Sequence, residues 1–264
     1  MGWKNCLKGC EKVLKVYAIG HSGFLVETEQ IYLLFDYYQG EMPMLDPKKK
    51  LFVFVSHKHA DHYNREIWKW KEQYGDACFI LSKDVPFSAR QRGILGISEE
   101  DCARVLRVRA NERYSLTDRE GETIWIDTLK STDLGVAYLV CYKGRYIYHA
   151  GDLNRWVWKG ESEDWNRDMA ERYTKQLEEL QKILGERRIL LAFLPVDPRQ
   201  EEEAFGGICE FLEKIAVDFV FPMHLWGKYY LAELCVKAVE ERVSGEKARS
   251  IVSGIGERKE WEFC

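Results

Sequence analysis

LFVFVSHKHADHYN, residues 51–64, places three histidines and one aspartate within six positions, directly after five apolar residues. The whole chain contains only six histidines. Residues 51–56 form a nearly continuous apolar run of strand length, which predicts a strand buried on both faces. Half of the imidazoles therefore stand where a buried strand ends, and buried imidazoles without partners are costly.

Metal binding accounts for this concentration of donors. Alternate residues of an extended segment point the same way, so His57 and His59 can share one ion. The chain must turn at the small Ala60, so Asp61 and His62 face a different direction. Four donors in this arrangement suit two adjacent ions, and the mixed histidine and carboxylate set favours zinc, with manganese or iron as alternatives. A polar loop with chance histidines is the competing interpretation.

Two later strand ends offer further ligands, and a site for two ions ideally includes a bridging carboxylate. Asp152 follows the strand-like run RYIYHA behind Gly151, and His224 ends the run DFVFPMH. Either residue alone would be weak evidence. Strand ends are, however, where α/β scaffolds assemble their sites. Three strand ends that each deliver a ligand type therefore predict one common metal site.

The rest of the pattern predicts two strand-rich halves that each end in helices, without a linker or a short-period repeat. The expected strands cover residues 13–19, 23–28, 31–36, 51–56, 77–81, 122–129, 135–142, 145–150, 189–196 and 218–224. The expected helices cover residues 64–75, 164–184, 201–215 and 229–243. The economical architecture is two sheets packed face to face with helices outside, in a single domain over 1–264.

Charge and composition narrow the class of protein. A net charge of -4 argues against sequence-independent nucleic-acid binding, which needs a basic face, and the run PKKK at 47–50 is better explained as a solvated loop. The eight cysteines form no CxxC pair, which is typical of reduced cysteines. The sequence shows no secretory h-region and no apolar run of about 20 residues, so we expect a cytoplasmic protein without a membrane segment.

HKHADH matches the HxHxDH motif, and the chain resembles the metallo-β-lactamase-fold metal-dependent hydrolases. The resemblance continues in order through Asp36 in YLLFDYY, the bridging-aspartate motif at Asp152 in HAGD, and the final histidine at His224 in FPMH. The opening IGHSGFLVET is most similar to the branch with the phosphorylated-ascorbate lactonase and related phosphodiesterases and phospholipases. The resemblance implies a four-layer αββα sandwich of two mixed β-sheets with flanking helices and a site along one edge.

The sequence departs from this family at one ligand. The superfamily normally supplies a third histidine to the first metal from the segment just before the run GVAYLV, but no histidine lies between His62 and His149. Asp133 is the only strong ligand in that segment, and an oxygen donor can replace an imidazole on zinc, iron or manganese. Asp133 is therefore a candidate ligand, with a turn residue as the alternative. His149 is expected to support a ligand or to pack in the core.

Three further residues are candidates for substrate contacts. His21 lies in the first hairpin loop, which in the resembling branch approaches the site. Trp156 follows a metal motif and could line a pocket, as could Trp158 and Trp226, although packing is the alternative. Arg199 follows another strand and could bind an anionic group or form a surface ion pair.

These features together predict a metal-dependent hydrolase of a small anionic ester, lactone or phosphodiester. Two divalent ions would acidify water and polarise the scissile oxygen. Asp61 would hold the second ion, orient that water and carry its proton, while Asp36 would fix the 57–62 loop. The alternatives are a non-catalytic metal-binding or sensing protein, which the absent histidine makes credible, and a nuclease, which would normally carry a basic arm that is not visible.

Overall fold

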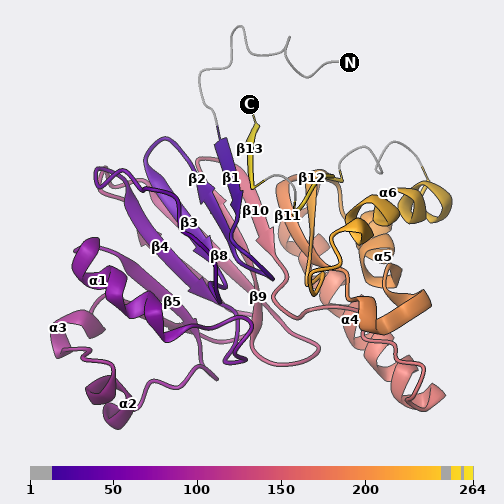
Figure 1. Ribbon diagram of the computed structural model, residues 1–264, viewed down its shortest axis with the longest axis horizontal. Coiled ribbons are helices and arrows are strands. Elements are labelled where there is room, and N and C mark those ends of the chain that lie inside the picture. The colour runs from indigo at the N-terminus through magenta and orange to yellow at the C-terminus, as the bar shows by residue number, and fades with distance from the viewer. Residues whose placement is uncertain (1–13, 245–250, 257–258, 264) are drawn as a thin grey trace, which may run out of the picture.

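Two β-sheets pack face to face in the computed structural model, which describes residues 14–244, 251–256 and 259–263 (Figure 1). Helices cover the outer side of each sheet. The predicted αββα sandwich of two mixed sheets is confirmed. None of the helices in these described ranges is long and apolar enough to cross a membrane.

The first sheet has seven strands in the order β13-β1-β2-β3-β4-β5-β6. Strands β3 to β6 are parallel, whereas β13, β1, β2 and β3 pair in antiparallel fashion. The strands are β1 (Leu14–Ala18), β2 (Phe24–Glu27), β3 (Ile31–Phe35), β4 (Lys50–Val55), β5 (Cys78–Ser82), β6 (Val105–Val108) and β13 (Glu260–Phe263). The first residue of the strand predicted at 13–19 lies outside the described residues.

Strand β4 is buried on both faces, as its apolar run predicts. Phe52 and Phe54 belong to the large core between the sheets, and Val53 and Val55 belong to the smaller core under the outer helices. Because β4 is parallel to β3 and β5, its carboxyl end lies at the same edge of the sheet as theirs. The histidine segment, residues 57–62, therefore leaves the sheet at that edge.

The second sheet has six strands in the order β12-β11-β10-β9-β8-β7. The strands are β7 (Arg113–Thr117), β8 (Thr123–Lys130), β9 (Val136–Tyr142), β10 (Arg145–His149), β11 (Ile189–Pro195) and β12 (Val217–Met223). Strands β10, β11 and β12 are parallel, so their carboxyl ends also share one edge. This arrangement brings the turn after β10 and the segment after β12 to the same place.

Contacts between the sheets lie directly below the histidine segment. The hydroxyl of Tyr138 in β9 donates to the carbonyl oxygen of Val55 at 2.9 Å, and the amide of Val136 donates to that of Ser56 at 3.0 Å. Gly135 has a φ of 71°, and a Cβ there would lie 2.0 Å from the same Ser56 oxygen. Glycine at this position therefore permits the close approach that holds the histidine segment against the second sheet.

The long helix α4 (Glu163–Leu184) confirms the prediction of a helix at 164–184. Ser162 caps its first turn, because its side chain accepts a hydrogen bond from the amide of Trp165. The buried face consists of the predicted stripe: Met169, Tyr173, Leu177, Leu180 and Leu184. Helix α6 (Tyr230–Arg242) matches the prediction at 229–243.

Two predicted helices are wrong in part. The helix expected at 64–75 is a 3-10 turn, η2 (Arg65–Lys69), followed by the short α1 (Trp70–Gln73). Ile67 and Trp68 are buried in η2, whereas α1 has no buried residue, so no continuous buried stripe supports one long α-helix over this segment. The helix expected at 201–215 divides into η3 (Pro198–Glu203) and α5 (Gly206–Lys214), with a φ of 52° at Glu201. The sequence patterns also missed α2 (Ala89–Ile94), α3 (Glu99–Cys102), β6, β7 and β13.

Candidate metal centre

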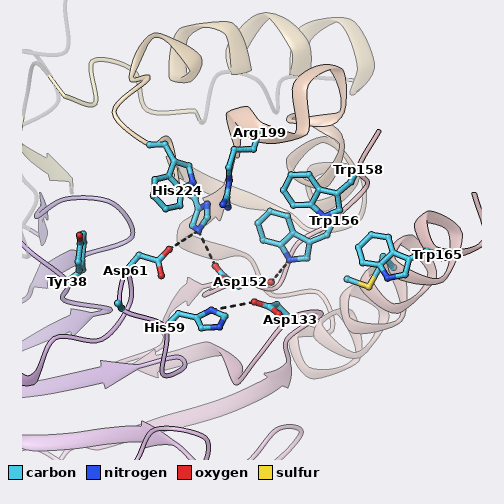
Figure 2. A pocket seen from close by; sticks show the side chains of 13 residues that line it. Tyr38, His59, Asp61, Asp133, Asp152, Trp156, Trp158, Trp165, Arg199 and His224 are labelled. Carbon is cyan, nitrogen blue, oxygen red and sulfur yellow. Dashed lines mark hydrogen bonds and ion pairs between the residues drawn. The ribbon is translucent and has the colours of Figure 1, made fainter. Parts of the chain in front are cut away.

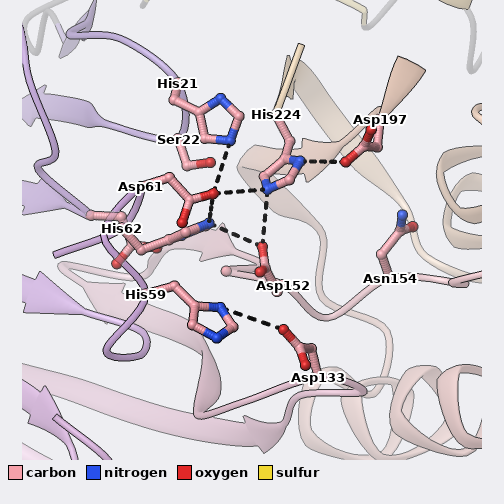
Figure 3. Close-up of polar contacts among 12 residues, drawn as sticks. His21, Ser22, His59, Asp61, His62, Asp133, Asp152, Asn154, Asp197 and His224 are labelled. Atoms are coloured by element: carbon pink, nitrogen blue, oxygen red, sulfur yellow. Dashed lines mark hydrogen bonds and ion pairs between the residues drawn. The ribbon is translucent and has the colours of Figure 1, made fainter. Parts of the chain in front are cut away.

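Side chains from both sheets converge at the shared edge (Figure 3). They follow β4, β8, β10 and β12, and one comes from the loop between β1 and β2. All seven predicted metal ligands are present in two adjacent groups: His57, His59, Asp61, His62, Asp133, Asp152 and His224. In each group, one potential ligand atom from every member lies within 4.8 Å of the others. Such spacing allows one ion to bind to several of them.

The outer group consists of His57, His59, Asp133 and Asp152. His57 Nε2 lies 3.0 Å from His59 Nδ1 and 3.2 Å from Asp152 Oδ2. His59 Nδ1 lies 3.6 Å from Asp133 Oδ2, so the carboxylate stands beside the two imidazoles. The side chains of His59 and Asp133 are 42% and 45% exposed, and this group therefore opens to solvent.

The inner group consists of His21, Asp61, His62 and His224, with Asp152 Oδ1 at its edge. Asp61 Oδ2 lies 3.4 Å from the Nε2 atom of His21, 3.8 Å from that of His62 and 3.7 Å from that of His224. The three imidazoles are buried, with side-chain exposures of 7% or less. The sequence analysis placed His21 near substrate, whereas the structure brings it among the ligand candidates.

Asp152 lies between the two groups. Its Oδ2 faces His57 in the outer group, while its Oδ1 lies 3.1 Å from His62 Nε2 and 3.5 Å from His224 Nε2 in the inner group. The side chain of Asp152 is only 7% exposed. Burial alone would raise the pKa of this carboxyl group, but the imidazoles of His62, His57 and His224 hold it well below its usual value. Asp152 is therefore an ionised carboxylate with one oxygen directed at each group.

Two buried carboxylates orient imidazoles of the inner group by contacting the Nδ1 atoms, which do not face the group. Asp36 follows β3 and accepts hydrogen bonds from the Ser56 amide at 2.7 Å and the Ser56 hydroxyl at 2.6 Å. Its Oδ2 also lies 2.8 Å from His62 Nδ1, and Asp197 Oδ2 lies 2.9 Å from His224 Nδ1. A proton on Nδ1 in each pair leaves the lone pair of Nε2 directed into the group, as a metal ligand requires.

Asp197 is a functional candidate that the sequence analysis missed. It follows β11, in the run LPVDPRQ, where a following proline makes an aspartate indistinguishable from an ordinary turn residue. The signal that could have found it is its position at another strand end of the same sheet. His149, by contrast, lies in the core as expected, is fully buried and stacks on Phe35 at 5.1 Å.

The charge balance of the inner group depends on shared protons. Burial lowers the pKa of His62, but Asp152 and Asp36 outweigh this effect and raise it well above the usual value. Burial likewise opposes ionisation of Asp61, yet His21, His224 and His62 lower its pKa. A bound cation would take the place of the imidazole protons, because metal ligands must be deprotonated.

The unpaired atoms also fit a metal ion. Within the described residues, nine buried side-chain nitrogen or oxygen atoms lack a hydrogen-bond partner, and four of them belong to the inner group. These four are His21 Nε2, His62 Nε2, His224 Nε2 and Asp152 Oδ1. Unsatisfied buried polar atoms are rare, and four in one place fit the donor set of a metal ion. Donors around a tetrahedral zinc ion lie about 3.3–3.6 Å apart, given bonds of roughly 2.0–2.2 Å, and the spacings of 3.0–3.8 Å in both groups are similar.

A cavity of about 650 Å³ opens above the two groups (Figure 2). His59, Asp61, Asp133, Asp152 and His224 contribute to its lining. Its walls are largely aromatic and include Tyr38, Trp156, Trp158, Trp165 and Trp226. The volume is within the range of small-molecule sites, which is roughly 300–1,000 Å³. His21 does not belong to the lining and lies among the ligand candidates instead.

The two other predicted substrate contacts have structural partners of their own. Trp156 lines the cavity, but it is 5% exposed and its Nε1 donates to the backbone oxygen of Asp152 at 2.9 Å. Arg199 lines the cavity and forms an ion pair with Asp197, as the alternative interpretation predicted. Its guanidinium lies 4.6 Å from the ring centroid of Trp226 and 5.8 Å from that of Trp158. The Arg199 charge is therefore partly offset before any ligand arrives.

Scans of the sequence against protein-family models and curated proteins find no match. Solved structures do match the fold. Igni18, a metallo hydrolase from the archaeon Ignicoccus hospitalis, is 17% identical, with a TM-score of 0.58 over 87% of this chain and 91% of that chain. YhfI from Bacillus subtilis, a metallo-β-lactamase fold protein, is 14% identical, with a TM-score of 0.56 over 96% and 100%. This chain has the metallo-β-lactamase fold.

The structure of this chain also matches that of CmlA, a diiron β-hydroxylase from Streptomyces venezuelae. CmlA is 13% identical, with a TM-score of 0.57, and the match covers 89% of this chain and 52% of CmlA. At such identities the likeness concerns the fold and not the reaction. The branch predicted from IGHSGFLVET stays a prediction.

Proposed function

We propose that the protein is a metal-dependent hydrolase with a dinuclear centre formed by the inner and outer groups. The observation that carries the proposal is the position of Asp152, a buried carboxylate with one oxygen directed at each group. The proposed ligands are His57, His59, Asp133 and Asp152 for one ion and Asp61, His62, His224 and Asp152 for the other. Zinc is the favoured metal for this mixed donor set, and manganese or iron also fit.

Two ions at such a centre supply acidified water and polarise a carbonyl or phosphoryl oxygen. The protein's own groups hold and orient the reactants. Asp61 lies at the cavity surface with 25% of its side chain exposed, so it can accept a proton from water and pass it to a leaving group. Asp36 does not reach the cavity, and its role is to position His62 and the histidine segment through Ser56.

The cavity supports a small substrate. Its aromatic walls and volume suit a compact molecule, and Arg199, the only lysine or arginine among the described residues of its lining, is already paired with Asp197. A nucleic-acid strand needs a long positive track, which this lining does not provide. The proposed substrate is therefore a small anionic ester, lactone or phosphodiester, with the bound ions as the main source of attraction for the anion.

A substrate panel tests this proposal directly. Protein loaded with zinc or manganese is expected to hydrolyse at least one member of a panel of small phosphodiesters and lactones, and to cleave single-stranded RNA and DNA poorly. The reason is the absence of a basic track in the lining of the cavity. Product formation, measured by absorbance or chromatography, checks the result. Efficient, salt-sensitive cleavage of nucleic acid without turnover of small substrates would instead favour a nuclease.

Asp133 provides a second test, because it stands where the family normally has a histidine. Asp133→Asn is expected to weaken the binding of one ion and leave the other unchanged, since Asp133 touches only the outer group. Asp133→His is expected to strengthen zinc binding there, because imidazole is a better zinc ligand than a half-exposed carboxylate. Metal titration of both variants checks this. Asp218→Asn, which alters an exposed carboxylate paired with Arg188, is the control.

Equal ion affinities in wild type, Asp133→Asn and Asp218→Asn would show that Asp133 is a turn residue. The Asp133 amide donates to the Ser131 hydroxyl at 3.1 Å in the bend between β8 and β9, as expected of a turn residue. A metal-loaded crystal with the Asp133 carboxylate more than about 4 Å from any ion would exclude coordination, since zinc–oxygen bonds are roughly 2.0–2.2 Å.

A further inference from the structure

We propose that His21 is a fifth donor to the inner group, and that this extra imidazole makes the inner position the tighter of the two ion sites. The inference rests on the proposed dinuclear centre and adds to it a ligand and an order of affinities. His21 comes from the loop between β1 and β2, far in sequence from the histidine segment and from His224.

The Nε2 atom of His21 has no other partner that explains its position. It is buried, lacks a hydrogen bond, and lies 3.4 Å from Asp61 Oδ2 (Figure 3). The ring centroid of His21 lies 4.2 Å from that of His224, so the two imidazoles approach the same space. Burying an imidazole nitrogen without a partner is costly, and coordination of an ion removes that cost. The absence of His21 from the cavity lining argues against a substrate contact.

The backbone around His21 is fixed by the second sheet. The amide of His224 donates to the carbonyl oxygen of His21 at 3.1 Å. His149 Nε2 lies 2.9 Å from the carbonyl oxygen of Ser22, and the Gly151 amide donates to the other ring nitrogen of His149 at 3.1 Å. This pair of contacts leaves the ring proton of His149 on Nε2, so His149 donates to the loop. His21 is therefore held in place beforehand, which reduces the ordering required when an ion binds.

The two groups differ in donor type and exposure. The inner group offers three imidazoles that are almost fully buried, together with oxygens of Asp61 and Asp152. The outer group offers two imidazoles and two carboxylates, and His59 and Asp133 are nearly half exposed. Nitrogen-rich sites favour zinc, whereas sites richer in carboxylate oxygen are better suited to manganese. The inner position should therefore fill first and retain zinc, while the outer position exchanges its ion with solvent and accepts manganese.

Metal titration with matched variants tests the inference on the full-length protein. Zinc is added to chelator-stripped protein in competition with a chromogenic chelator, and wild type is expected to show two distinct affinities. His21→Phe is expected to weaken binding of the more tightly held zinc ion by about 10–100-fold, the range found when groups that support a metal site are lost. His59→Phe is the matched variant, because it also replaces an imidazole by a phenyl ring but in the outer group. It should weaken binding of only the second, less tightly held zinc ion.

Cobalt gives a readout that does not depend on activity. The first equivalent of Co²⁺ in wild type should show the weak visible absorption of a five-coordinate ion. His21→Phe should show the stronger bands of a four-coordinate ion. His21→Gly should do the same, and because it leaves the space of the ring empty, added imidazole should restore the wild-type spectrum in that variant. His21→Gln, which keeps a polar side chain, serves if the phenylalanine variant does not fold, and it should show a partial loss of affinity.

The possible outcomes separate the two proposals. A folded His21→Phe or His21→Gln protein with wild-type affinity and an unchanged cobalt spectrum would overturn the role of His21 and leave the dinuclear centre standing. Weakening of the tighter ion by His59→Phe would overturn the proposed order of affinities. Failure of wild type to bind any ion would remove the proposed function itself.

Discussion

Replacement of Asp152 by asparagine is expected to reduce the metal content from about two ions per chain to one or fewer, and to lower hydrolysis to below about one hundredth of the wild-type rate. The carboxylate directs one oxygen at His57 and the other at His62 and His224. An amide of the same shape keeps one oxygen but loses the negative charge and the second acceptor. Both groups would therefore lose a proposed ligand from one substitution.

The fold is expected to survive this change, because Asp152 lies at the edge of the sheets and not in the core between them. Elemental analysis after purification without chelator measures the metal content, and circular dichroism checks the fold. Asp218→Asn is again the matched control, since it changes an exposed carboxylate on the second sheet. A normal metal stoichiometry in Asp152→Asn would show that the bridging assignment is wrong.

Removal of the metal is expected to lower the melting temperature by roughly 8–16 °C. An ion present at about 1,000 times its dissociation constant stabilises the folded state by about 4.1 kcal/mol. For a domain of roughly 150–250 residues, each kcal/mol corresponds to about 2–4 °C. The effect has a structural reason here, because the first sheet supplies His57 and His62 while the second supplies Asp152 and His224. Bound ions would connect the two sheets at their shared edge.

Differential scanning calorimetry with and without chelator measures this shift. The Asp152→Asn variant is the control, because its melting temperature should respond much less to chelator if the effect comes from the ions. Identical melting temperatures for the wild type in both conditions would contradict the prediction. Readdition of zinc should restore the original value, which separates metal loss from irreversible damage.

The sequence indicated the sandwich and most of the candidate centre because its signals are local. Three histidines and an aspartate after one buried strand are visible at a glance, and Asp152 and His224 stand at the ends of two other recognisable strands. Asp133 could be named because the resembling family normally supplies a histidine from the segment before β9, and Asp133 is the only carboxylate in that segment. Each of these residues lies after a run of apolar residues from which a strand, and the position of its end, could be predicted.

The residues that escaped prediction depend on distances that no local pattern contains. In the sequence, Asp197 resembles the first residue of a turn. Only the parallel pairing of β11 with β12 brings its carboxylate into contact with His224 Nδ1. His21 was expected near the site as a substrate contact, but its place among the ligand candidates depends on a contact between distant parts of the chain, in which the His224 amide donates to the His21 carbonyl oxygen. Strand β13 has only four residues, EWEF, so its pairing with β1 was not visible.

The division of ligands between the two sheets also has a consequence for synthesis of the chain. The ribosome synthesises β1 to β6 before any strand of the second sheet, so Phe52 and Phe54 have no opposing sheet until that sheet is made. The histidine segment is complete at this stage, but Asp152 and His224 have not yet been made. The nascent chain can therefore offer an ion only part of the centre. If these residues bind metal as proposed, we expect complete metal loading only after β12 and the following His224 have been synthesised.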